Sequence, residues 1–100
     1  AIMIHSRKKD PAEIFEFVEK FREKNTTTPI VVVPTSFNTV TEQEFKERGV
    51  NVVIYANQLT RTGFPAMQDA ARTILENHRA KECDDKCMSI KEIITLIPEE

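Results

Sequence analysis

Apolar residues gather in three short runs along the chain: Ala1–His5, Ile30–Val33 and Asn51–Tyr55. The last two are rich in β-branched residues and are apolar almost throughout, with little alternation between polar and apolar positions. Strands that are apolar on both faces are typical of parallel sheets flanked by helices, or of the inner wall of a barrel. The runs therefore predict three strands of a parallel α/β fold.

The polar segments that follow contain clear helix starts. Each of three capping boxes places a short polar side chain three residues before a glutamate: Asp10–Glu13, Thr41–Glu44 and Ser89–Glu92. After the first box, with Pro11 at the first helical position, apolar residues recur at helical spacing at Ile14, Phe17, Val18 and Phe21. We expect the second helix to end at Gly49 and the helix after Ser89 to end near Pro98.

A longer helix is predicted around residues 67–75, where the apolar face consists of Met67, Ala70, Ala71, Ile74 and Leu75. Its start stays open, because Pro65 fits either the first turn or a kink. The charged segment 79–86 lacks periodicity and is predicted to be an exposed connection. Strands alternating with helices imply right-handed crossovers and one parallel sheet.

The chain begins inside a predicted strand. Three parallel strands with their helices leave an open sheet edge and a lopsided core, which natural domains usually avoid. We therefore expect residues 1–100 to form the last part of one larger α/β domain.

Composition narrows the function classes. The chain has 14 basic and 16 acidic residues, closely interspersed, so a nucleic acid is not an expected partner. It has no apolar run near the roughly 20 residues of a membrane helix and no visible signal peptide, which predicts a soluble, cytoplasmic protein. The two glycines, Gly49 and Gly63, form no phosphate-binding fingerprint. The C-x-x-x-C spacing of Cys83 and Cys87 favours ordinary reduced thiols over a metal or redox site.

Candidate chemistry lies where the strands end, because ligands of parallel α/β folds bind at the carboxyl ends of strands. His5 is the strongest candidate, since an imidazole on a rigid strand end can hold an anion or move a proton. The alternative is a histidine that bonds only to backbone. Thr35 and Asn57 are either ligand contacts or ordinary loop starts, and Arg61 either binds an anion or forms a salt bridge.

The loop after His5 adds Ser6, Arg7 and Lys8, which we interpret either as an anion-holding patch or as a solvated loop. The strand ends carry no carboxylate cluster, so no divalent-metal site is predicted from these residues. The sequence also offers no Ser-His-Asp or Cys-His arrangement.

Four motifs resemble a known family. At Ile4–Ser6, Val33–Thr35, Val53–Asn57 and Ser89–Ile93 the chain is similar to the C-terminal part of the phosphoenolpyruvate mutases. These enzymes belong to the isocitrate lyase/phosphoenolpyruvate mutase superfamily. The resemblance covers essentially all 100 residues in order, with supporting stretches at Asp10–Ile14 and Pro65–Gln68.

The resemblance implies a TIM-type β/α barrel, of which this chain supplies about the last three strands. It implies dimers or dimers of dimers that swap their last helices, here the regions near Met67–Leu75 and Ser89. The implied reaction interconverts phosphoenolpyruvate and phosphonopyruvate, a step of phosphonate biosynthesis, with Mg²⁺ held by acidic residues outside this chain. His5 matches the family's substrate-binding catalytic histidine, and Ser6, Thr35 and Asn57 would form part of the active-site wall.

Other functions stay open at this point. Gln58 stands where the family often has a histidine, and the related phosphonopyruvate hydrolases share most of these motifs. A hydrolase or a carbon–carbon lyase of the same superfamily is therefore the second hypothesis. A third, of a different class, is that the 100-residue chain is an inactive assembly module that dimerises through its helices.

Overall fold

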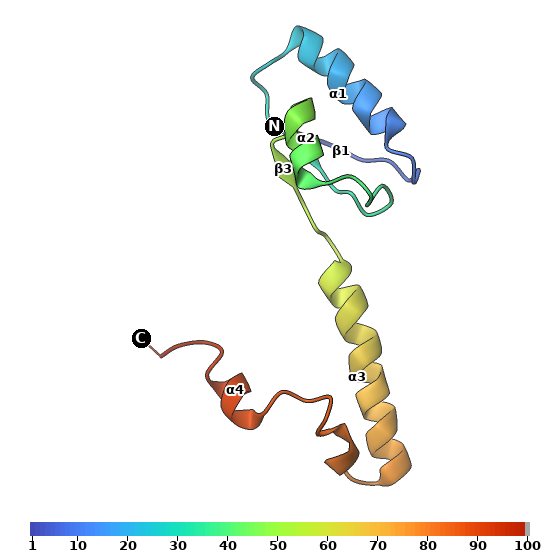
Figure 1. The fold of residues 1–100 in the computed structure, drawn as a ribbon, viewed down its shortest axis with the longest axis vertical. Helices are drawn as coiled ribbons and strands as arrows, with labels where there is room; N and C mark the ends of the chain where they lie inside the picture. Colours follow the sequence, from blue (N-terminus) through green and yellow to red (C-terminus); the bar gives the residue numbers. More distant parts are fainter. Residues whose placement is uncertain (100) are drawn as a thin grey trace. The chain divides into compact units, whose positions relative to one another are not determined.

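A computed structural model describes residues 1–99, which divide into two compact units at Gln58 and Leu59 (Figure 1). The first unit contains, in order, β1 (Ile2–Ile4), α1 (Ala12–Lys24), β2 (Ile30–Val32), α2 (Glu42–Arg48) and β3 (Val52–Val53). The second contains most of α3 (Gln58–Asn77), a short 3₁₀ helix η1 (Lys81–Cys83) and α4 (Ile90–Ile94).

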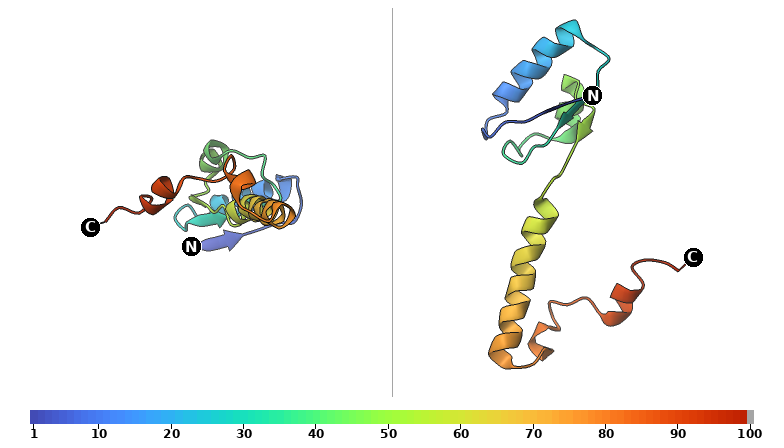
Figure 2. Two further views of the ribbon diagram at one scale, coloured as in Figure 1. Left: turned by 90° about the horizontal axis from the view of Figure 1, so that it is seen from below. Right: turned by 180° about the vertical axis from the view of Figure 1, so that it is seen from behind.

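The three strands form one parallel sheet in the order β1-β2-β3; β1 and β3 are labelled in Figure 1, and Figure 2 shows the chain from two further sides. Ile2 pairs with Ile30, and Val31 pairs with Val52. The predicted parallel α/β sheet is thus confirmed. Each strand is shorter than its apolar run.

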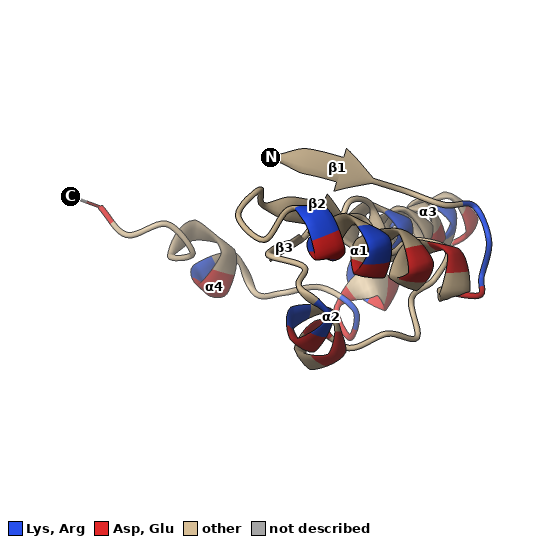
Figure 3. Cartoon of the chain, turned by 90° about the horizontal axis from the view of Figure 1, so that it is seen from above, with Lys and Arg blue, Asp and Glu red and all other residues tan. Residues whose placement is uncertain are grey.

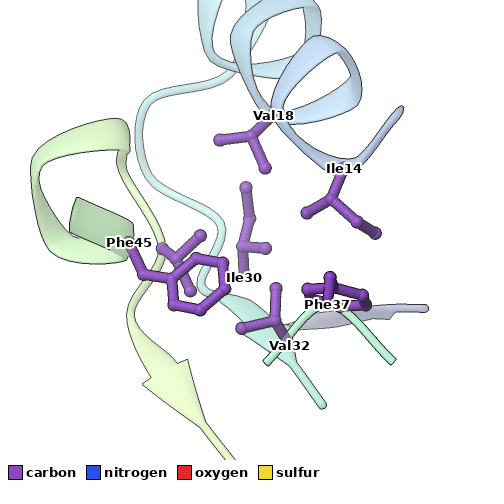
Figure 4. Packing of buried hydrophobic residues seen from close by; sticks show 7 residues of the cluster. Ile14, Val18, Ile30, Val32, Phe37 and Phe45 are labelled. Carbon is purple, nitrogen blue, oxygen red and sulfur yellow. The ribbon is translucent and has the colours of Figure 1, made fainter. Parts of the chain in front are cut away.

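Both helices pack on the same face of the sheet. Ile30 and Val32 of β2 are fully buried and point toward α1 and α2, which contribute Val18 and Phe45 (Figure 4). Phe37, from the loop after β2, is equally buried, and its ring meets that of Phe45 edge-on at 6.3 Å. The three strands carry no charged residue, whereas α1, α2 and the loop after β1 carry many (Figure 3).

The opposite face of the sheet remains apolar and open. Met3 of β1 is 62% exposed and Val52 of β3 is 45% exposed. The expectation that both faces would be covered is therefore met on one face only within the described residues.

The helix starts and ends mostly follow the local signals. Thr41 caps α2 by accepting a hydrogen bond from the Glu44 N–H, and Gly49 ends it in a left-handed conformation with a φ of 100°. Ser89 caps α4 in the same way as Thr41 caps α2. The predicted helical ends are confirmed at these positions.

The first capping box is built differently from the prediction. Asp10 accepts from the N–H of Ala12, two residues on, so that an Asx turn precedes the helix and Pro11 takes the cap position. The Glu13 carboxylate pairs with Lys8 at 3.2 Å and does not bond back to the cap residue, as it would in a capping box. The hydrogen bond from the Ala12 N–H to Asp10, which closes a turn before the helix, thus replaces the two reciprocal hydrogen bonds of a capping box.

The structure resolves one open point in the second unit and corrects one expectation. The start of the long helix, which the sequence left open, is Gln58, so Pro65 lies inside α3 and not in its first turn. The segment 79–86 is mostly exposed, as predicted, but it contains η1, in which Cys83 is buried with its thiol 3.5 Å from the Ala70 carbonyl oxygen. The last helix ends at Ile94, well before Pro98.

The helices of the second unit leave most of their large apolar side chains exposed: Leu59, Phe64, Met67, Ile74, Leu75, Ile90, Ile93 and Ile94. None of the described residues of α3 is buried. Within the described residues, no helix is both long and apolar enough to cross a membrane.

Candidate active site

His5 follows β1 directly, and its imidazole bonds to the neighbouring strand segment. Its Nδ1 lies 3.1 Å from the carbonyl oxygen of Val33, 28 positions further along the chain. A carbonyl oxygen can only accept, so Nδ1 must carry the proton and donate it. The other ring nitrogen, Nε2, is then an acceptor in the neutral ring and a donor only in the protonated one.

Two features hold this arrangement in place. The backbone N–H of Thr35 also donates to the Val33 carbonyl oxygen, at 2.9 Å, which closes a tight turn around Pro34. The His5 ring lies 6.1 Å from the ring of Phe37, inclined at 48°. Because Phe37 is fully buried, it gives the exposed histidine a rigid neighbour on one side.

The other predicted wall residues have different environments. Ser6 is buried, and its hydroxyl oxygen accepts from the Lys8 N–H at 3.2 Å, so it shapes the loop after β1. Thr35 shares the Val33 carbonyl with His5, which confirms that the ends of β1 and β2 come together. A direct part for Ser6 or Thr35 in ligand binding stays a prediction.

Asn57 lies four residues after β3, directly before α3, and is half-buried. Its backbone N–H bonds to the side chain of Gln58, and its Oδ1 is buried without a partner among the described residues. A buried acceptor of this kind is normally satisfied, so the Asn57 oxygen is an unpaired acceptor between β3 and α3 among the described residues. Arg61, one turn on, is exposed on α3.

Sequence reasoning missed Phe37 and the pair formed by Tyr55 and Glu42. The Tyr55 hydroxyl donates to a carboxylate oxygen of Glu42 at 2.6 Å, which ties the end of β3 to the first turn of α2. This hydrogen bond raises the pKa of Tyr55, with desolvation and the negative charge of Glu42 acting in the same direction. Phe37 lies in a polar segment without helical or strand periodicity, so no sequence pattern identified it as a core residue.

The phosphoenolpyruvate phosphomutase family model matches residues 1–75. The chain belongs to the phosphoenolpyruvate phosphomutase family. The match begins in β1 and runs through most of α3, so it includes His5, Thr35 and Asn57.

Individual family members are similar over nearly the whole chain. The phosphoenolpyruvate phosphomutase of Tetrahymena pyriformis is 35% identical over 96% of this chain, which corresponds to 31% of that protein. The phosphonopyruvate hydrolase of Variovorax sp. (strain Pal2) is 37% identical over 96% of this chain and 32% of its own length. The chain thus spans about a third of the length of the curated relatives that it matches.

Solved structures of the family have the same fold. The phosphoenolpyruvate phosphomutase of Streptomyces platensis subsp. rosaceus superposes with a TM-score of 0.84 at 29% identity, over 94% of this chain and 32% of that one. A phosphonopyruvate hydrolase in complex with oxalate and Mg²⁺ superposes with a TM-score of 0.80 at 35% identity, over 93% and 32%.

Magnesium does not fit this chain's described residues by themselves. Residues 1–99 bring together no group of three or more His, Cys, Asp or Glu side chains that would hold a metal ion. What the strand ends do offer is a hydrogen-bonded imidazole, a tight turn and an unused amide oxygen.

Proposed function

We propose that the chain is part of a phosphoenolpyruvate mutase, an isomerase that interconverts phosphoenolpyruvate and phosphonopyruvate, and that His5 binds the substrate. The observation that carries this proposal is the geometry of His5 within a family match that covers residues 1–75. Both compounds are multiply charged anions, so their reaction needs fixed hydrogen-bond donors.

His5 is suited to that task by its backbone bond. Since Nδ1 donates to Val33, Nε2 donates to a substrate oxygen only when it is protonated, and the ring is then a cation facing the anion. The strand end and Phe37 orient the ring before substrate arrives, so little reorganisation is needed when charge moves between oxygen and carbon.

Replacing His5 in the full-length enzyme tests the proposal. We expect His5→Ala to lower turnover of phosphonopyruvate by about 10²- to 10³-fold, the usual loss on removing one fixed donor. His78→Ala is the matched control, because His78 is the other histidine and lies in the second unit. Unchanged activity in His5→Ala would remove His5 from the site.

A phosphonopyruvate hydrolase is the second candidate, and the 37% identity to the Variovorax enzyme favours it specifically. Product analysis by ³¹P NMR separates the two: a mutase yields phosphoenolpyruvate, and a hydrolase yields phosphate and pyruvate. A carbon–carbon lyase of the superfamily would give neither set of products.

We further propose that residues 1–100 are the C-terminal part of one TIM-type barrel domain in a cytoplasmic enzyme. The open apolar face of the sheet, with Met3 and Val52 exposed, supports a barrel interior on that side. The complex of a related hydrolase with oxalate and Mg²⁺ supports a magnesium enzyme whose metal ligands lie outside this chain.

Assembly is the remaining part of the proposal. The exposed apolar side chains of α3 and α4 support a homo-oligomer in which these helices are swapped between partners. In the alternative of a different class, the 100-residue chain is an assembly module without activity of its own. Magnesium-dependent turnover of phosphonopyruvate by the purified 100-residue chain would refute that alternative.

A further inference from the structure

The loops after β1 and β2 border an open cavity of about 360 Å³, on the same edge of the sheet as His5. Its lining consists of two cations, three hydroxyl side chains and one amide: Arg7, Lys9, Thr35, Ser36, Asn38 and Thr39. Neither a carboxylate nor His5 belongs to this lining. The cavity is therefore positively charged and rich in hydrogen-bond donors.

The three consecutive cations in the loop after β1 have different surroundings. Lys8 turns away to pair with Glu13 of α1, at 3.2 Å, while its backbone N–H bonds to the Ser6 hydroxyl. Arg7 and Lys9, on either side, line the cavity. Among residues 1–99 neither of them forms an ion pair, so their two charges are left for another group. This basic stretch follows β1 in Figure 3.

The facing wall is anchored to the core. Phe37, which stands in sequence between the lining residues Ser36 and Asn38, is fully buried in the core and so anchors the loop after β2. Thr35 is held by its backbone bond to Val33. The hydroxyl and amide groups therefore belong to a loop tied down at two points, which lowers the ordering cost of binding.

We propose that this cavity binds a doubly charged tetrahedral oxyanion, the phosphate or phosphonate group of a small molecule. The planar fork of Arg7 matches two oxygens of such a group, Lys9 adds a point charge, and the hydroxyls donate to the remaining oxygens. The volume lies at the small end of the range for ligand sites, which suits a compact anion. This inference does not depend on the mutase reaction.

Inorganic phosphate is the probe. Titrated into the ¹⁵N-labelled chain at low ionic strength, it is expected to shift the amide signals of residues 35–39 saturably. Arg7→Gln and Lys9→Gln should each weaken binding by about tenfold or more, the usual effect of losing a charge-assisted bond. Lys8→Gln is the matched control, since it removes the same charge from the same loop, and its affinity should stay within about twofold of the parent's.

Three results would overturn the proposal. Amide shifts that never saturate with phosphate would mean that there is no binding site. Equal losses of phosphate affinity in Arg7→Gln, Lys9→Gln and Lys8→Gln would mean that phosphate is attracted only by the overall charge of the loop. Loss of phosphate binding in His5→Gln means that the anion sits at the imidazole instead. Signals outside the loops report whether each variant is folded, and Arg7→Lys, which keeps the charge, should recover part of the affinity.

Phosphonopyruvate separates the two sources of the anion. If its phosphonate occupies this cavity, it shifts the same amides, and phosphate competes with it. If phosphonopyruvate leaves these amides unmoved while phosphate shifts them, the cavity is a site for free phosphate or another phosphorylated molecule. Both results support the oxyanion site.

Discussion

The carbonyl of Val33 accepts two hydrogen bonds, from the His5 ring and from the Thr35 backbone. One backbone atom thereby sets both the protonation pattern of the imidazole and the first turn of the neighbouring loop. The fixed orientation matters more for anion binding than the mere presence of a histidine, because a mobile ring would lose conformational freedom on binding.

The ring nitrogens of His5 provide a direct check. With the imidazole neutral, we expect ¹⁵N chemical shifts that place the proton on Nδ1, because Val33 accepts from that atom. The chain contains only two histidines, so the spectrum of the His78→Asn variant shows the ring signals of His5 only and thereby assigns them. A proton found on Nε2 would contradict the hydrogen bond to Val33.

Tyr55 is the only tyrosine of the chain, and tryptophan is absent, so its phenol can be titrated by ultraviolet absorbance. The hydrogen bond to Glu42 favours the neutral phenol and raises its pKa. The bond's contribution to folding is therefore present below the ordinary tyrosine pKa of about 10 and is lost as the pH rises through the higher folded value.

In the titration, we expect the Tyr55 midpoint to lie above its ordinary value and to fall in Glu42→Gln, which removes the charge but keeps an acceptor. Glu47→Gln, on the same helix and away from Tyr55, should leave the midpoint unchanged. Equal midpoints in the parent and Glu42→Gln would count against the pair.

Among the elements, α1 is tied to the start of β3 by one side chain. The Arg22 guanidinium donates to the Gly49 carbonyl oxygen at 2.8 and 3.1 Å, to the Asn25 carbonyl oxygen, and to Asn51 Oδ1 at 2.9 Å. The Asn51 side chain in turn accepts from the Ile30 N–H at the start of β2. Arg22 thus joins the last turn of α1 to the loop between α2 and β3.

Arg22→Gln should lower the free energy of unfolding by about 2 kcal/mol, the usual scale for hydrogen bonds to a charged group. Urea denaturation measures the change. Lys24→Gln, in the same turn but exposed, is expected to cost less than about 0.5 kcal/mol. Similar losses in both variants would show that the effect comes from charge at the helix end.

Across the whole molecule, the exposed apolar side chains of α3 and α4 are the main departure from an ordinary soluble surface. Light scattering should therefore find a mass that rises with protein concentration. Phe64→Glu and Met67→Glu should reduce the association, since each places a charge among these exposed apolar side chains.

Glu76→Gln is the control for these variants, because it changes an exposed polar position on the same helix. A strict monomer at every concentration tested would contradict the assembly proposal. Association that survives both glutamate variants would place the contact elsewhere, for example at the open face of the sheet.

Much of the fold was predictable because its signals are local. The β-branched runs mark the strands, Thr41 and Ser89 cap the helices that follow them, and the left-handed conformation at Gly49 needs a residue without a side chain. Each of these signals acts within a few positions along the chain. The parallel sheet then follows from the alternation of strands and helices.

His5 was found from the sequence because it comes directly after an apolar run, where ligands of parallel folds bind. Its bond to Val33, its contact with Phe37 and the cavity between Arg7 and Thr35 all join residues far apart in sequence. Only the tertiary structure decided them, because a side chain's partners depend on which segments the fold brings together. The burial of Cys83 has the same cause, since its thiol meets a carbonyl on a different helix.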